Sequence, residues 1–239
     1  QSRRSLRLRY RIFDQGSKLV QQAIETGALF EQQTWQELTA HCLTNQSPLH
    51  LLGLLSDGNV HSHIDHVIAI LNRADSQDIQ EAYIHVLLDG RDVPKTSALE
   101  YVEQLEATLS SINSKANRRY LIASGGGRMT TTMDRYEADW SMVERGWETH
   151  VLGQARGFSS TRQAIETLRE ETPGISDQDL PNFVINENGK PIATIEDGAA
   201  VIVFNFRGDR MLEMTQAFED SDFTHFDRKR FPEIFFAAM

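Results

Sequence analysis

The sequence has a single cysteine in 239 residues, Cys42, so no disulfide can form within the chain. This fits a reducing compartment, and we expect a cytoplasmic protein in which Cys42 is a small apolar residue on a helix. The sequence also lacks an apolar run long enough to span a bilayer and shows no signal-peptide pattern. We therefore expect no membrane partner.

An excess of basic residues is missing as well. Acidic residues outnumber Lys and Arg by 34 to 24, which gives a net charge of −10. A polyanion is bound through a basic face, so this balance argues against general nucleic-acid binding. The exception is residues 1–11, which carry five arginines (Arg3, Arg4, Arg7, Arg9 and Arg11). We interpret them as an atypical solvated tail; an artefact of the reading frame and a nucleic-acid arm are the alternatives.

What the sequence does contain is short apolar runs that alternate with helical patterns. The predicted strands are residues 49–55, 83–88, 120–123, 200–204 and 234–238, together with a hairpin of 183–185 and 192–195 around Asn188-Gly189. Alternation of strands and helices indicates one α/β domain over residues 12–239, and the hairpin makes its sheet mixed rather than parallel. We expect helices to flank this sheet, which is either open or curled toward a barrel.

One helix is expected to begin at Asp134, because Asp134-x-x-Glu137 has the spacing of a capping box. The aromatic and apolar residues that follow at helical spacing are then predicted to face the core: Tyr136, Trp140, Val143 and Trp147.

Polar residues follow four of the predicted strands directly, and arginines recur among them. Glycine at a strand end lets a ligand approach the backbone, and arginine offers a planar fork that matches phosphate or carboxylate oxygens. The sequence therefore predicts one site for a small anion at the strand ends. Alternatively, each arginine pairs with a nearby acid such as Asp89, Asp134 or Asp209. The arginines concerned are Arg91, Arg128, Arg135, Arg207 and Arg210.

Two residues of these loops could move protons. Asp92 follows Arg91, and a carboxylate beside arginines stays ionised, which suits a base. His61 lies in the turn after residues 49–55 and could transfer a proton or donate a hydrogen bond to a substrate oxygen. A metal pair of His61 with His63 is a weaker alternative, and the sequence offers no metal-ligand motif. Ser124 precedes three glycines but lacks the context of a nucleophile elbow.

Four strings in this order resemble cofactor-independent phosphoglycerate mutases. They are Gly-Leu-Leu-Ser-Asp-Gly-Asn-Val-His-Ser-His (Gly53 to His63), Asp-Gly-Arg-Asp (Asp89 to Asp92), Gly-Gly-Arg with Met-Asp-Arg-Tyr (within Gly126 to Tyr136) and Phe-Asn-Phe-Arg-x-Asp-Arg (Phe204 to Arg210). The resemblance implies a two-domain enzyme, of which this chain is similar only to the phosphotransferase, or substrate-binding, domain. The absent domain would carry two divalent ions, usually Mn²⁺, and a serine that becomes phosphorylated.

The resemblance also implies a glycolytic isomerase that interconverts 3-phosphoglycerate and 2-phosphoglycerate. Asp92 and His61 are then catalytic, and the substrate-binding set is His61, Arg91, Asp92, Arg128, Arg135, Arg207 and Arg210. The chain lacks the family's nucleophile motif near its start and has Gly208 where Ala or Pro is usual. We expect a monomer that binds no metal and is inactive alone, with the metal domain and phosphoglycerate as its partners. A non-catalytic module for phosphorylated metabolites or organic acids is the alternative.

Overall fold

The computed structural model describes residues 16–239, and these form one α/β domain built on an eight-stranded mixed sheet. The strands are β1 (Leu49–Leu55), β2 (Glu81–Leu88), β3 (Arg119–Gly127), β4 (Arg156–Phe158), β5 (Phe183–Glu187), β6 (Lys190–Pro191), β7 (Ala200–Val203) and β8 (Phe235–Ala238). Their order is β4-β5-β3-β2-β1-β7-β8, with β6 paired to β5. This path has two ends, so the sheet is open and is not closed into a barrel.

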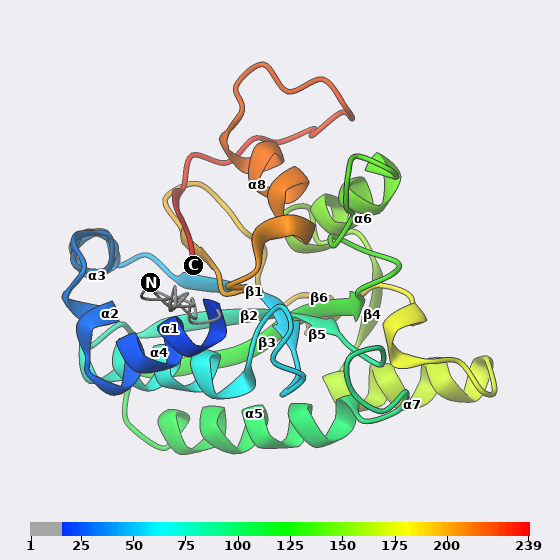
Figure 1. Cartoon of the computed structure of the whole chain (residues 1–239), viewed down its shortest axis with the longest axis horizontal. Helices are drawn as coiled ribbons and strands as arrows, with labels where there is room; N and C mark the ends of the chain where they lie inside the picture. Colours follow the sequence, from blue (N-terminus) through cyan, green and yellow to red (C-terminus); the bar gives the residue numbers. More distant parts are fainter. Residues whose placement is uncertain (1–15) are drawn as a thin grey trace, which may run out of the picture.

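The α-helices are α1 (Gly16–Glu25), α2 (Ala28–Glu31), α3 (Gln33–Asn45), α4 (Ile64–Ser76), α5 (Ala98–Asn113), α6 (Trp140–His150), α7 (Thr161–Glu171) and α8 (Leu212–Glu219), with short 3₁₀ turns at Asp177–Asp179 and Gly208–Arg210. Helices α4, α5 and α7 lie on one face of the sheet, and α6 and α8 lie on the other (Figure 1). No helix among residues 16–239 is long and apolar enough to cross a membrane.

Alternation along the strands explains these two layers. In β1, Leu49, Leu51 and Leu55 pack in the core beneath α4 and α5, whereas Leu52 and Leu54 pack in the core beneath α6 and α8. All seven residues of β1 are buried, as a central strand covered on both faces requires. The sequence prediction of a mixed sheet flanked by helices is confirmed: β5 runs antiparallel to β3, and β1 runs parallel to β2 and β7.

Two of the predicted strands are wrong in their extent. The strand predicted to end at residue 123 continues through the three glycines to Gly127, with a register shift at Ile84/His85 of its neighbour. The hairpin keeps its turn at Asn188-Gly189, but its second strand is only Lys190–Pro191. The Arg-rich tail, residues 1–11, lies outside the described residues.

The helix expected from Asp134 begins instead at Trp140, with Asp139 as its cap. The Asp134 carboxylate accepts a hydrogen bond from the Asp139 amide at 2.9 Å, and Tyr136 and Glu137 have left-handed backbones (φ 64° and 55°). Tyr136 is 80% exposed rather than in the core. Trp147 is fully buried as predicted.

Candidate functional site

The carboxyl ends of β1, β2, β3 and β7 meet at one edge of the sheet, because these four neighbouring strands run parallel. Every site residue predicted from the sequence follows one of these strands. His61 follows β1, Arg91 and Asp92 follow β2, Arg128 and Arg135 follow β3, and Arg207 and Arg210 follow β7. Ligands of open α/β sheets bind outside such strand ends.

A buried carboxylate, Asp89, organises the loop after β2. Its Oδ1 accepts hydrogen bonds from the amides of Gly90, Arg91 and Asp92 at 3.0–3.1 Å, and its Oδ2 accepts one from the Ser56 hydroxyl at 2.8 Å. Burial acts to raise the pKa of Asp89, but these hydrogen bonds and a nearby guanidinium outweigh it and lower that pKa. Asp89 is therefore a fixed negative charge that shapes the turn carrying Arg91 and Asp92.

The guanidinium beside Asp89 is that of Arg128, which is only 1% exposed. Its Nη1 donates to Asp89 Oδ1 at 3.0 Å and to Asp92 Oδ2 at 2.5 Å, whereas its Nε is buried without a hydrogen-bond partner among the described residues. A buried charge needs compensation, and Asp89 supplies it. Arg128 thereby ties the ends of β2 and β3 together and positions the Asp92 carboxylate.

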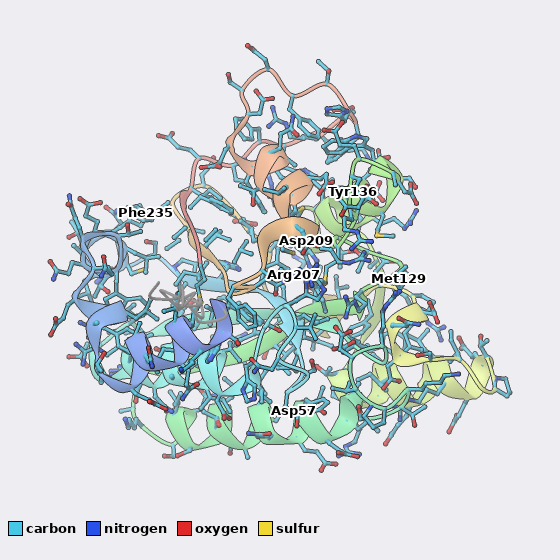
Figure 2. All side chains as sticks on the ribbon, viewed as in Figure 1. Asp57, Met129, Tyr136, Arg207, Asp209 and Phe235 are labelled. Atoms are coloured by element: carbon cyan, nitrogen blue, oxygen red, sulfur yellow. The ribbon has the colours of Figure 1, made fainter. Side chains whose placement is uncertain are left out.

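Asp209, in the 3₁₀ turn after β7, is the second centre of the site. Its carboxylate lies 3.1 Å from Arg207 Nε, 3.7 Å from Arg135 Nη1 and 3.5 Å from His61 Nδ1. Figure 2 shows Arg207 and Asp209 in this loop, above the sheet. Asp209 thus draws together residues that follow three different strands.

The remaining two arginines differ in environment. Arg210 is buried and donates to the carbonyl of Met133 at 3.1 Å. Burial, followed by the charges of Arg128 and Arg135, lowers its pKa, with Arg91 acting in the same direction. Arg91 itself is exposed and makes no ion pair within residues 16–239. Positive charge is therefore crowded at this edge. The Arg91 guanidinium, without an ion pair among the described residues, is available to bind a ligand.

His61 is only 4% exposed, and its Nδ1 makes no hydrogen bond within the described part of the chain. Burial, with a contribution from the charge of Arg128, lowers its pKa to about 4. At neutral pH the imidazole is uncharged, so it can donate or accept a hydrogen bond but carries no proton to release as a cation. His63, the other member of the suggested metal pair, instead accepts a hydrogen bond from the Asp65 amide and lies near His66.

The ion pairs at the edge indicate the ligand class. Three of the five arginines pair with Asp89, Asp92 or Asp209, whereas Arg91 and Arg210 make no ion pair within residues 16–239. No cluster of three or more His, Cys, Asp or Glu that could hold a metal ion occurs in residues 16–239. The residues of this edge thus suit an anion.

Comparison with known proteins agrees with this geometry. Residues 20–239 match the model of the family described as the BPG-independent PGAM N-terminus (iPGM_N). The chain belongs to this family. It is 54% identical over 229 residues to a probable 2,3-bisphosphoglycerate-independent phosphoglycerate mutase of Leptospira interrogans. The match covers 96% of this chain and 42% of the relative. The corresponding enzymes of Trypanosoma brucei brucei and Prunus dulcis are 47% and 49% identical, with 96% of this chain and 42% and 46% of the relatives covered.

A crystal structure of Leishmania mexicana phosphoglycerate mutase at low cobalt concentration superposes with a TM-score of 0.92 at 48% identity. The match covers 94% of this chain and 41% of that one. The chain thus spans less than half the length of these relatives of the iPGM_N family. Its fold and the resemblance seen in its motifs are confirmed by these matches.

The roles of Asp89 and Asp209 could not be read from the sequence, which indicated them only as ion-pair partners of the arginines. That alternative is correct for Arg128, Arg135 and Arg207, and Asp134 pairs instead with a backbone amide. The same contacts bring the predicted site residues together, so pairing and convergence on one site are not exclusive. The sequence signal that points to Asp89 and Asp209 is their position, because both lie within the motifs that follow the strands.

Proposed function

We propose that this chain is the substrate-binding part of a phosphoglycerate mutase that interconverts 3-phosphoglycerate and 2-phosphoglycerate. The observation that carries the proposal is the meeting of five arginines at one sheet edge in a member of the iPGM_N family. Phosphoglycerate carries a carboxylate and a phosphate, and both match the planar fork of arginine. Two arginines without an ion pair among the described residues, Arg91 and Arg210, favour such an anion over a neutral sugar.

The residues take different parts in this proposal. Arg91 makes no ion pair within residues 16–239 and Arg207 is 49% exposed, so both side chains can turn toward the ligand at little cost. Arg128 and Arg210 are buried and held by protein groups, so they act as fixed charges behind it. Arg135 completes the set beside Asp209.

Asp92 is proposed as the proton acceptor or donor at the 2- and 3-hydroxyls. One carboxylate oxygen is engaged by Arg128, which leaves the other to contact a hydroxyl. Neutral His61, 3.5 Å from Asp209, is proposed to hydrogen-bond the phosphate or the hydroxyl that carries it.

The activity is proposed to need a second domain, since the described residues contain no metal cluster and the chain spans under half of its relatives. We expect this chain, a cytoplasmic monomer, to bind phosphoglycerate and to turn none over, with or without added Mn²⁺. No step assigned to residues 16–239 passes through a metal ion.

Calorimetric titration with 3-phosphoglycerate tests the proposal through Arg91→Ala. Arg91 has no ion pair in the described chain, so its removal should spare the fold and remove one charge-assisted contact. We expect binding weakened by about 10- to 100-fold, the worth of a hydrogen bond to a charged group. Arg156→Ala is the matched control: Arg156 is exposed, pairs with Glu171 and lies over the Phe158 ring, away from the site.

A folded chain that binds no phosphoglycerate would contradict the proposal, as would equal binding by the Arg91→Ala variant and the wild type. Glycerate, which lacks the phosphate, should bind much more weakly. Tight binding of glycerate would favour an organic-acid binding module instead.

A further inference from the structure

A chain of buried hydrogen bonds crosses the layer between the sheet and α6, outside the arginine site. His50 Nδ1 lies 2.9 Å from His85 Nε2, and His85 Nδ1 lies 2.6 Å from the Ser124 hydroxyl. Ser124 is also 2.8 Å from His150 Nδ1, and His150 Nε2 is 3.0 Å from the hydroxyl of Thr132. All five side chains are 0–1% exposed. Burying three histidines in an apolar core costs free energy unless hydrogen bonds compensate for it.

Chemistry restricts the direction of this chain. Burial lowers the pKa of all three imidazoles, so each is neutral and has one N–H and one bare nitrogen. Every link must therefore point the same way along the chain. At its β1 end, His50 Nε2 is buried with no partner among the described residues. A buried N–H without a hydrogen-bond partner is rarer in proteins than a buried acceptor without one. We therefore assign His50 Nε2 as the nitrogen that carries no proton.

With this direction, His50 and His85 carry their protons on Nδ1, and His150 carries its proton on Nε2 and donates it to Thr132. The hydroxyl of Thr132 lies 3.3 Å from that of Thr131, to which it can donate in turn. The chain thus starts on β1, an inner strand of the sheet, and ends on a loop.

That loop runs from Arg128 to Arg135, and Thr132 is its strained point. Thr132 has φ 68°, a left-handed backbone that costs energy for a β-branched residue and persists only when neighbours enforce it. Helix α6 packs against it so tightly that a Cβ on Gly146 would lie 2.4 Å from the Thr132 hydroxyl. The next residue, Met133, presents the carbonyl that accepts from Arg210.

We propose that Thr132, held by the chain of His150, Ser124, His85 and His50, is a positioning residue that fixes the loop carrying Arg128 and Arg135. Thr132 contacts no ligand. It fixes the backbone between Arg128 and Arg135, and with it the Met133 carbonyl that accepts a hydrogen bond from Arg210. The consequence for ligand affinity rests on the proposed function, but the anchoring of the loop does not.

Hydrogen exchange on the 239-residue chain without ligand tests the anchoring. Thr132→Val keeps the shape and removes the hydroxyl, which leaves the His150 N–H unpaired. The amides of Thr131, Thr132 and Met133 donate hydrogen bonds at 2.7–3.1 Å to the end of β3, to α6 and within the loop. They should then exchange about tenfold faster. Thr132→Ser restores the hydroxyl and should return protection to within about twofold of wild type.

Amides of β2 are the internal reference for these rates. A loop that loosens locally exchanges faster than wild type while β2 keeps its protection, whereas a uniform acceleration means general destabilisation and overturns the proposal. Thr39→Val is the matched control, because the Thr39 hydroxyl is buried in α3 and lies 3.5 Å from Gln77 Oε1, far from this loop in the fold. It should leave the loop amides unchanged.

Binding of 3-phosphoglycerate is the second measurement, and Thr132→Val should weaken it about tenfold, with recovery in Thr132→Ser. Unchanged affinity in Thr132→Val would overturn the positioning role. If wild type binds no phosphoglycerate while the exchange pattern appears as described, the proposed function fails and the anchoring stands.

The wild-type protein alone provides a third measurement, which no folding defect can disturb. Imidazole ¹⁵N chemical shifts should report Nδ1–H for His50 and His85 and Nε2–H for His150. The opposite set of tautomers would leave Thr132 donating to His150 and would overturn the assigned direction.

Discussion

Mild acid is expected to destabilise this protein well before its carboxylates titrate, because its core contains neutral histidines. Burial lowers the pKa of His50 and His150 to about 3, and it lowers that of His85 well below the ordinary value. His61 and His66, also buried, have pKa values lowered to about 4, again chiefly by burial. In the unfolded chain these groups titrate near pH 6.5.

The sign follows from proton binding. Between pH 6.5 and the lowered pKa values, the unfolded state takes up protons that the folded state refuses, so the free energy of unfolding falls as the pH falls. Above pH 6.5 both states are neutral and the histidines have no effect. At pH 5.5 each group costs about 1.4 kcal/mol, so the three fully enclosed histidines cost about 4 kcal/mol together. A domain stable by about 5–15 kcal/mol loses a large part of its stability there.

Urea unfolding followed by tryptophan fluorescence at pH 7.5, 6.5, 6.0 and 5.5 measures this slope. His50→Phe should remove about one of the protons taken up on unfolding, a decrease of about 1.4 kcal/mol per pH unit in the limiting slope, whatever it does to stability at pH 7.5. A wild-type loss below about 1 kcal/mol between pH 7.5 and 5.5 would refute the reasoning, since it would mean that the folded state accepts these protons. The lowered pKa values of Asp75 and Asp89 cannot mimic the effect, because carboxylates act only nearer pH 4.

Three further predictions concern single positions and are read from urea unfolding at pH 7.5. Gly127→Ala should destabilise by about 3 kcal/mol, because a Cβ there would lie 2.3 Å from the carbonyl oxygen of Gln178 and backbone must move. Asp89→Asn should cost about 3 kcal/mol, because it leaves the Arg128 charge buried beside a neutral group; a loss under 1 kcal/mol would mean that Asp92 alone compensates it. Tyr136→Ala should change stability by less than about 0.5 kcal/mol, since the side chain is 80% exposed and lies against Arg135; a larger loss would restore Tyr136 to the core.

The first strand was predictable because its signals are local. An apolar run such as residues 49–55 is bounded by turn formers, and the observed strand has the same limits. Once strands alternate with helices, parallel pairing follows, and parallel pairing brings the loops after β1, β2, β3 and β7 to one edge. Arginines in those loops therefore lie at the same edge, which is why their common location could be predicted from the sequence.

The start of α6 was not predictable, because the same local pattern has two outcomes. Asp134-x-x-Glu137 can cap a helix, but here the Asp134 carboxylate bonds the amide of Asp139, and Glu137 N–H donates to the distant Glu213 carboxylate at 3.0 Å. A contact across 76 residues thus competes with a cap across three. Sequence spacing cannot weigh the two, and in the structure Tyr136 and Glu137 have left-handed backbones.

The histidine chain lies further beyond sequence reasoning, since its links join residues 35, 39, 26 and 18 positions apart. Each histidine taken alone reads as an ordinary member of a strand or helix. Their relation appears only when β1, β2 and β3 align and α6 packs over them. Polar groups in a core restrict which arrangements can form, because every alternative packing would leave several of them unpaired. The residues of the candidate site thus lie in local motifs, whereas those that hold the motifs in place depend on the whole fold.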